Sequence, residues 1–146
     1  MPRILPRLAA SPFLTWSPRR RRRSFTNGIL YATSAHHTIA LDVATGAPRW
    51  RYHSGKPMIG GLAATGGDVD FAGEISGDFL ALDADNGNVL YRHNLGGPIA
   101  GGIVSYAVGG KQYVAAVSGF VGGYYNQMAP EIGGGNPTIT VFGLKP

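Results

Sequence analysis

The feature of this 146-residue sequence that most constrains its fold is an internal repeat with a spacing of 41 residues. The segment Ala40-Leu-Asp-Val-Ala-Thr-Gly46 recurs as Ala81-Leu-Asp-Ala-Asp-Asn-Gly87, and an aromatic residue follows each copy at the same distance, as Trp50 and Tyr91. A third unit is partial and ends with Pro137-Thr-Ile-Thr-Val-Phe-Gly-Leu144. A fixed period of this size indicates a repeat architecture, in which each unit packs on its neighbours.

Each repeat consists of short β-rich runs separated by turn signals, with no helical stretch long enough to make a parallel crossover. The 23 glycines of the chain suit an architecture with many tight turns. We therefore predict an all-β fold, a partial β-propeller of about three four-stranded antiparallel blades. WD40-type propellers and helical arrays have similar periods, but the Gly-His and Trp-Asp signatures are absent and the composition is that of strands.

Composition divides the chain near residue 26. Residues 1–26 hold seven of the 13 basic residues, are rich in proline, arginine and serine, and show neither helical nor strand periodicity. We predict that they form a disordered basic leader and that residues 27–146 form the propeller repeats. Beyond the leader six basic residues face eight acidic ones, so the repeats are not expected to bind nucleic acid. The run Arg19–Arg23 could do so, but a solvated tail is favoured.

Membrane and export signals are not evident in the sequence. No stretch approaches the roughly 18 apolar residues of a membrane-spanning helix. Proline and arginine interrupt each apolar run of the first residues, so there is no recognisable signal peptide. The chain contains no cysteine, which excludes disulfides, thiolate metal sites and cysteine nucleophiles and leaves the redox compartment open.

Several repeated residues have a structural explanation. Gly46 and Gly87 stand where a tight hairpin requires positive φ. The acids Asp42, Asp83 and Asp85 could be imagined as a general acid/base set, but their recurrence at the turn favours hairpin capping. No Ser-His-Asp triad or phosphate loop is evident.

Three residues are expected to decide how the repeats pack. Trp50 and Tyr91 are large enough to fill the gap between neighbouring blades, so we predict a packing role for both. Asp70 stands where a buried strand residue is expected. Because burying an unpaired carboxylate is costly, we predict that Asp70 lies at an exposed edge or marks a site of weakness.

The repeat motif resembles the tryptophan-docking repeat of quinoprotein alcohol dehydrogenases, which depend on pyrroloquinoline quinone (PQQ). The motif is present as Ala40-Leu-Asp-Val-Ala-Thr-Gly-Ala-Pro-Arg-Trp50, whereas the second copy has Asn86 in place of threonine and Tyr91 in place of tryptophan. Residues 60–119 look like the C-terminal blades of that family, and Thr138–Leu144 resembles its final strand.

This resemblance implies an eight-bladed periplasmic propeller that holds PQQ and a calcium ion near its axis, where an Asp base assists hydride transfer from an alcohol or sugar. Most of the metal ligands of the family and its catalytic Asp lie on earlier blades that this sequence does not contain. We therefore assign no catalytic residue and no metal ligand, and the calcium ligands are not present here.

The resemblance places cofactor contacts where the C-terminal blades reach the axis. The candidate cofactor-binding residues are Gly60, Gly61, Ser118, Gly119, Phe120 and Val121. Glycine-rich segments are more often turns than cofactor cradles, so the structural alternative stays open for each of them. The four histidines, His36, His37, His53 and His93, are interpreted as surface loop residues and not as metal ligands.

Three functional hypotheses follow. The first is a fragment of a PQQ-dependent dehydrogenase that oxidises an alcohol or sugar and is not catalytically complete by itself. The second is a non-catalytic propeller scaffold that binds protein partners, similar to outer-membrane assembly proteins. The third is a chain without function, because three blades in an open arc would expose sheet edges and favour self-association.

Overall fold

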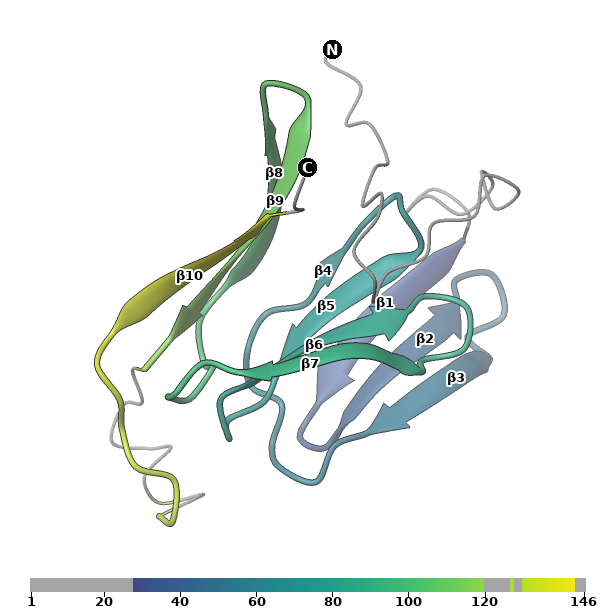
Figure 1. Ribbon diagram of the computed structural model, residues 1–146. Coiled ribbons are helices and arrows are strands. Elements are labelled where there is room, and N and C mark those ends of the chain that lie inside the picture. Colours follow the sequence, from purple (N-terminus) through teal and green to yellow (C-terminus); the bar gives the residue numbers. More distant parts are fainter. Residues whose placement is uncertain (1–27, 120–126, 128–129, 144–146) are drawn as a thin grey trace.

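The computed structural model describes residues 28–119, 127 and 130–143. The predicted leader, residues 1–26, lies outside the described residues. In the described part of the chain, ten strands form three antiparallel sheets that follow one another along the sequence (Figure 1). Within those ranges no helix has the length and apolar character needed to cross a membrane. The all-β propeller architecture predicted from the repeat is confirmed.

Each sheet is a simple meander, because its strands are neighbours both in the sheet and in the sequence. Only the second sheet has the predicted four strands among the described residues, and the other two have three. Sheet 1 contains β1 (Ile29–Ser34), β2 (His37–Asp42) and β3 (Pro48–His53), sheet 2 contains β4 (Ala63–Ala64), β5 (Val69–Gly73), β6 (Asp78–Asp83) and β7 (Val89–Asn94), and sheet 3 contains β8 (Ile103–Val108), β9 (Lys111–Ser118) and β10 (Thr138–Gly143).

The strand registers show which strands of the three sheets are equivalent. A register shift in the β2–β3 pair at Ala40/Leu41 recurs 41 residues later in the β6–β7 pair at Ala81/Leu82. The β4–β5 pair aligns Ala63 with Phe71, and the β8–β9 pair aligns Val104, 41 residues after Ala63, with Ala115. Strands β1 to β3 therefore correspond to β5 to β7, and β8 to β10 correspond to β4 to β6. Among the described strands, sheet 1 has no counterpart of β4 and sheet 3 none of β7.

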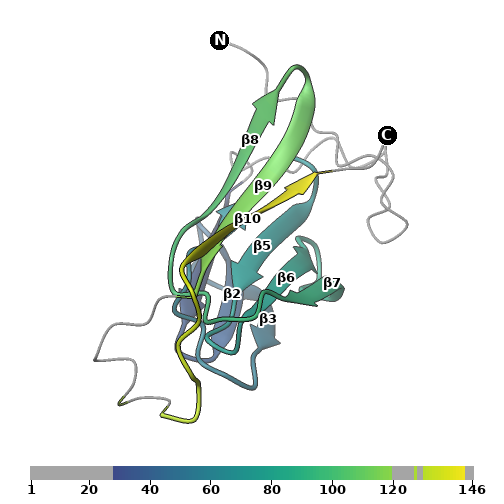
Figure 2. The ribbon, with the colours of Figure 1, turned by 60° about the vertical axis from the view of Figure 1, so that its left-hand side comes forward.

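Two hydrophobic clusters join the sheets face to face, and sheet 2 is buried on both sides (Figure 2). We call the side of a sheet that points to the next sheet along the chain its forward face and the opposite side its backward face. Alternate residues of β5 and β6 point to opposite sides, as the pleat of a strand requires. The forward face of sheet 2 thus packs on sheet 3, and its backward face packs on sheet 1. The first of these interfaces contains Val69, Phe71, Phe79, Ala81, Val114 and Ala116, and the second contains Ile29, Ala40, Trp50, Ala72, Leu80 and Leu82.

The turn residues that the repeat singled out have the predicted conformations. Gly46 and Gly87 have φ values of +70° and +75°. One carboxylate oxygen of Asp42 accepts hydrogen bonds from the backbone N–H groups of Ala44 and Thr45, each at 3.1 Å. A carboxylate oxygen of Asp83 likewise accepts the N–H of residue 85 at 2.8 Å. The capping interpretation is confirmed for these two acids.

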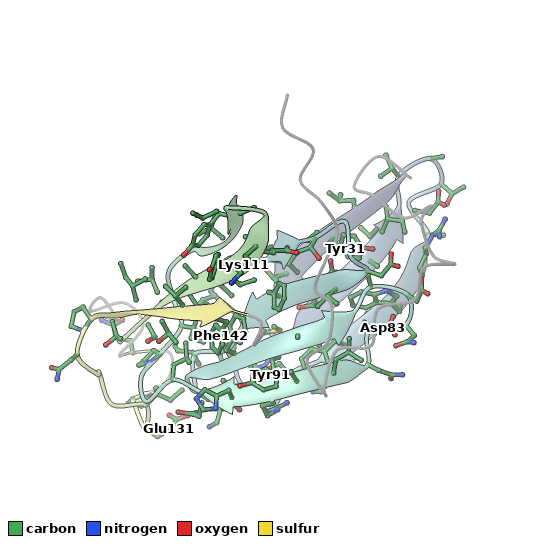
Figure 3. All side chains as sticks on the ribbon, turned by 45° about the horizontal axis from the view of Figure 1, so that its top comes forward. Tyr31, Asp83, Tyr91, Lys111, Glu131 and Phe142 are labelled. Carbon is green, nitrogen blue, oxygen red and sulfur yellow. The ribbon has the colours of Figure 1, made fainter. Side chains whose placement is uncertain are left out.

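The aromatic residues of the repeat lie between sheets, as predicted. Trp50, on β3, is buried and donates its indole N–H to the carbonyl oxygen of Ala84 in the β6–β7 turn at 2.8 Å. A Cβ atom added to Gly87 would stand 2.6 Å from the Trp50 ring, so glycine is also needed for this close approach. One interface further along, the rings of Tyr91 on β7 and Phe142 on β10 lie edge to face at 6.3 Å (Figure 3). Both residues therefore connect a sheet to the next.

Asp70 does not lie at an exposed edge, so that alternative was wrong. It lies in β5 between Leu82 of β6 and Ala64 of β4, and its exposed fraction is 0%. Neither of its carboxylate oxygens has a hydrogen-bond partner among the described residues. Burial, reinforced by the charges of Asp68 and Asp83, raises the pKa of Asp70 to about 7. The alternative that survives is a site of weakness in the sheet 1–sheet 2 interface.

Candidate functional site

The connections between strands come together at one end of the arc. They are residues 54–62 between β3 and β4, residues 74–77 between β5 and β6, and residues 95–102 between β7 and β8. Backbone hydrogen bonds tie them together, from Ile75 N–H to the Pro57 carbonyl at 2.9 Å and from Ile99 N–H to the Glu74 carbonyl at 3.2 Å. This end carries every described candidate cofactor residue.

Gly60 and Gly61 lie just before β4 and pack against the connection 95–102. A Cβ atom on Gly60 would stand 2.8 Å from the carbonyl oxygen of Ile99, and one on Gly61 would stand 3.2 Å from the backbone nitrogen of Ile103. The N–H of Gly61 donates to the Gly101 carbonyl at 2.9 Å. Glycine is required at these positions because two stretches of backbone approach closely, which is the structural alternative that the sequence left open.

Ser118 and Gly119 end β9 and reach the same connection from sheet 3. Gly119 has a φ of +95° and donates its N–H to the Pro98 carbonyl at 2.8 Å. A Cβ atom at Gly119 would overlap the backbone of Asn136. Ser118 pairs with Thr138 across the β9–β10 ladder, and its buried hydroxyl has no hydrogen-bond partner in the described part of the chain.

The candidate residues therefore flank one segment and do not converge on a common point. Gly60 and Gly61 contact it at residues 99–103, and Gly119 contacts it at residues 97–98. Phe120 and Val121, the remaining two candidates, lie outside the described residues. The spaces beside the three glycines are filled by backbone, so they do not form an open cradle for a quinone. The unsatisfied hydroxyl of Ser118 is the feature that fits a bound acceptor group.

A buried polar network at this end was not found from the sequence. The carboxylate of Glu74, 3% exposed, accepts the phenol O–H of Tyr52 at 3.0 Å and the hydroxyl of Ser76 at 3.1 Å. Arg92 donates to the Tyr52 oxygen and to Asp78, each at 2.8 Å. The network links β3 of sheet 1 to sheet 2. A signal was available, because Arg92 follows Arg51 by 41 residues, but it gave no partner.

Burial and the neighbouring Glu74 raise the pKa of the Tyr52 phenol to about 12, so Tyr52 stays protonated and serves as a donor. Replacing Tyr52 with phenylalanine is expected to lower the free energy of unfolding by about 1–2 kcal/mol, because Glu74 and Arg92 each lose one hydrogen bond. Urea denaturation followed by circular dichroism measures this change. Tyr106→Phe, which removes a hydroxyl from an exposed ring on β8, is the control and should change stability by less than about 0.5 kcal/mol. Equal losses in both variants would contradict a role for the network.

The histidines do not all lie in loops, and that interpretation was wrong for three of them. His37 is on β2, His53 on β3 and His93 on β7, and only His36 lies in a turn. Their repeat positions place them at strand ends, and the ring nitrogens of His37 and His53 come within 3.1 Å of each other. No group of three potential metal-ligating side chains occurs within the described ranges.

Comparisons with known proteins place this geometry in context. Residues 11–125 match the profile of a PQQ repeat family described as outer membrane protein assembly factor BamB. The dehydrogenase subunit of a quinone alcohol dehydrogenase from Gluconobacter oxydans (strain 621H) is 43% identical over 88 residues, which are 60% of this chain and 12% of that protein. A lanthanide-dependent methanol dehydrogenase from Methylorubrum extorquens is 38% identical over 86 residues, or 59% of this chain and 14% of that protein.

The solved structures that resemble the chain are of the same kinds. A europium-containing methanol dehydrogenase superposes with a TM-score of 0.67 at 26% identity and covers 76% of this chain and 24% of that one. BamB from Moraxella catarrhalis superposes with a TM-score of 0.52 at 21% identity, over 64% of this chain and 29% of that one, which shows the fold alone. The chain thus spans only a small part of the relatives that it matches.

Proposed function

Because the chain belongs to the PQQ repeat family described as outer membrane protein assembly factor BamB, we propose that it is part of a quinone-dependent alcohol or sugar dehydrogenase. The observation that carries this proposal is the 43% identity over 88 residues to a quinone alcohol dehydrogenase. The similarity to the BamB structure is at 21% identity and supports the fold without the function. Since the match covers 12% of that relative, the chain is proposed not to be catalytically complete by itself. Its proposed location is the periplasm.

The proposed ligand of this end of the arc is PQQ, which would act as the two-electron acceptor when bound. Ser118 is proposed to donate its hydroxyl to an acceptor oxygen of the quinone, because that hydroxyl is buried without a partner among the described residues. Gly60, Gly61 and Gly119 are proposed to act indirectly, by allowing the connection 95–102 to lie close to β4 and β9. Phe120 and Val121 remain proposed contacts by resemblance. No calcium ligand is assigned in this chain.

The test is a titration of the purified chain with PQQ, with and without calcium, followed by quinone absorbance and a dye-linked alcohol assay. We expect saturable binding without dye reduction. Absence of saturable binding would exclude the cofactor proposal, and dye reduction by this chain alone would contradict the proposed catalytic incompleteness.

Two serine variants sharpen the same titration. Ser118→Ala is expected to weaken PQQ binding about 10-fold, the loss of about 1.4 kcal/mol that one good hydrogen bond supplies. Ser105→Ala on β8 is the control, because the Ser105 hydroxyl accepts a hydrogen bond from Gln112 and does not lie at the loop end. Equal affinity in both variants would remove Ser118 from the proposed site.

A second candidate function is a non-catalytic scaffold for protein partners. The observation that favours it is the exposed apolar surface of sheet 3, which includes Val104, Ile139 and Val141. Under this alternative the titration gives no PQQ binding while the folded chain keeps its capacity to associate with protein.

A further inference from the structure

Sheet 3 presents an apolar forward face that no other described sheet covers. Val104 on β8 and Ile139 and Val141 on β10 are 55%, 69% and 51% exposed. They share one side of the sheet, because Val104 and Val141 both pair with Ala115 and Ile139 pairs with Val117 on β9. Exposed apolar surfaces of this kind commonly mark interaction sites.

The repeat shows what this face is built to contact. Phe79 on β6 pairs with Gly73, and Ile139 on β10 pairs with Val117, the residue equivalent to Gly73. Ile139 is therefore the counterpart of Phe79. In the chain itself Phe79 stacks on Phe142 of the following sheet, with ring centroids 4.3 Å apart. The forward face of sheet 2 is thus covered by the backward face of sheet 3.

Sheet 1 presents the matching backward face at the other end of the arc. Leu30 pairs with Leu41, and Ala32 pairs with Ile39. The equivalent pairs in sheet 2 are Asp70 with Leu82 and Ala72 with Leu80. All four of those sheet 2 residues are 0% exposed because sheet 1 covers them, whereas Leu30 is half exposed. Leu41 is the counterpart of Phe142, since Phe142 pairs with Val114 just as Leu41 pairs with Leu30.

We propose that the forward face of sheet 3 binds the backward face of sheet 1 of a second copy of this chain, with Ile139 of one copy against Leu41 of the other. Contacts between the same two faces already occur twice within each copy, at the sheet 1–sheet 2 and sheet 2–sheet 3 interfaces. The contact is head to tail, so each copy keeps one free face of each kind and larger assemblies form as concentration rises. It does not depend on whether the chain binds a quinone.

The test is sedimentation velocity over a concentration series of the full chain, whose monomer mass is 15.3 kDa. The wild-type chain is expected to form species larger than a monomer, in amounts that increase with concentration. Ile139→Glu and Leu41→Arg should each shift the chain to monomers, because each places a charge in an apolar contact. A wild-type chain that stays monomeric at every concentration would overturn the proposal.

An equimolar mixture of the two variants gives the decisive result. The Ile139→Glu copy keeps an intact backward face and the Leu41→Arg copy keeps an intact forward face, so the mixture should form a dimer that grows no further. A mixture that stays monomeric would contradict head-to-tail contact, as would association of either variant alone. Leu30→Arg, at a half-exposed position of the same face, replaces Leu41→Arg should that variant not fold.

Val43→Glu is the control, because Val43 is exposed in the β2–β3 turn and lies on neither face. It should associate as the wild-type chain does. Loss of association in this variant too would show that general surface hydrophobicity, not the two faces, drives self-association.

Discussion

Replacing Asp70 with valine is expected to raise the free energy of unfolding at pH 8 by about 4 kcal/mol or more. The Asp70 side chain is fully buried in β5 and has no hydrogen-bond partner among the described residues. The equivalent positions of the other sheets hold apolar residues, Leu30 on β1 and Val114 on β9. Valine therefore restores the residue type of the repeat and removes a buried carboxylate.

The sign of the pH dependence follows from the raised pKa. An aspartate with a pKa of 3.8 when unfolded and about 7 when folded binds its proton more tightly in the folded state. The stability that this proton supports is complete below pH 3.8 and is lost as the pH rises through 7. The loss is about 1.4 kcal/mol for each pH unit that separates the folded and unfolded pKa values. The advantage of the valine variant should therefore grow between pH 4 and pH 7 and be constant above pH 8.

Urea denaturation of both proteins from pH 4 to pH 9 measures the difference directly, and subtracting the two curves cancels the titration of distant groups. Asp70→Asn is the matched control, because it removes the titration and keeps a buried polar group of the same size. It should abolish the pH dependence without the full gain in stability. Parallel curves for wild type and Asp70→Val would show that Asp70 is not the titrating group.

Replacing Trp50 with alanine should lower the free energy of unfolding by about 3–5 kcal/mol, which is a large part of the stability of a small domain. The ring is buried between β3 and the β6–β7 turn, where it packs on Gly87 and its N–H bonds the Ala84 carbonyl. Truncation leaves a cavity between sheets 1 and 2 and an unpaired carbonyl at its wall.

Two further variants separate the contributions of the ring and the hydrogen bond. Trp50→Phe keeps an aromatic ring and should lose about 1–2 kcal/mol, mainly from the hydrogen bond. Leu30→Ala, at a half-exposed position on the opposite face of sheet 1, should cost much less than Trp50→Ala. Far-UV circular dichroism during urea unfolding is a suitable measurement, because the substitution itself removes indole fluorescence. A loss below about 1 kcal/mol for Trp50→Ala would contradict its role as the connection between sheets.

Features that occur in both copies of the repeat could be predicted from the sequence. Gly46 and Gly87 could be assigned positive φ, and Trp50 and Tyr91 could be placed between sheets, because two copies with one spacing must occupy equivalent places. The burial of Asp70 could not be decided in advance, since strand alternation predicts an inward position while the cost of an unpaired carboxylate predicts an outward one. The structure shows that position in the repeat prevailed.

The candidate site was harder to predict than the fold. Glu74, Tyr52 and Arg92 occupy different positions in different repeats, so their network arises from packing and not from the period. Gly60, Gly61 and Gly119 were selected by resemblance, and the sequence could not distinguish a glycine that admits a ligand from one that admits neighbouring backbone. Their backbone contacts answer that question for the described residues.

The meander order of the three sheets has a consequence for how the molecule opens. Strands that pair are adjacent in sequence, so closing each sheet orders only a short loop and carries a small entropic cost. The arc then behaves as a short row of units coupled only to their nearest neighbours. Sheet 1 or sheet 3 can unfold by breaking one interface, whereas sheet 2 can unfold only when both are broken. Amide hydrogens of β5 and β6 should consequently be the last in the chain to exchange with solvent.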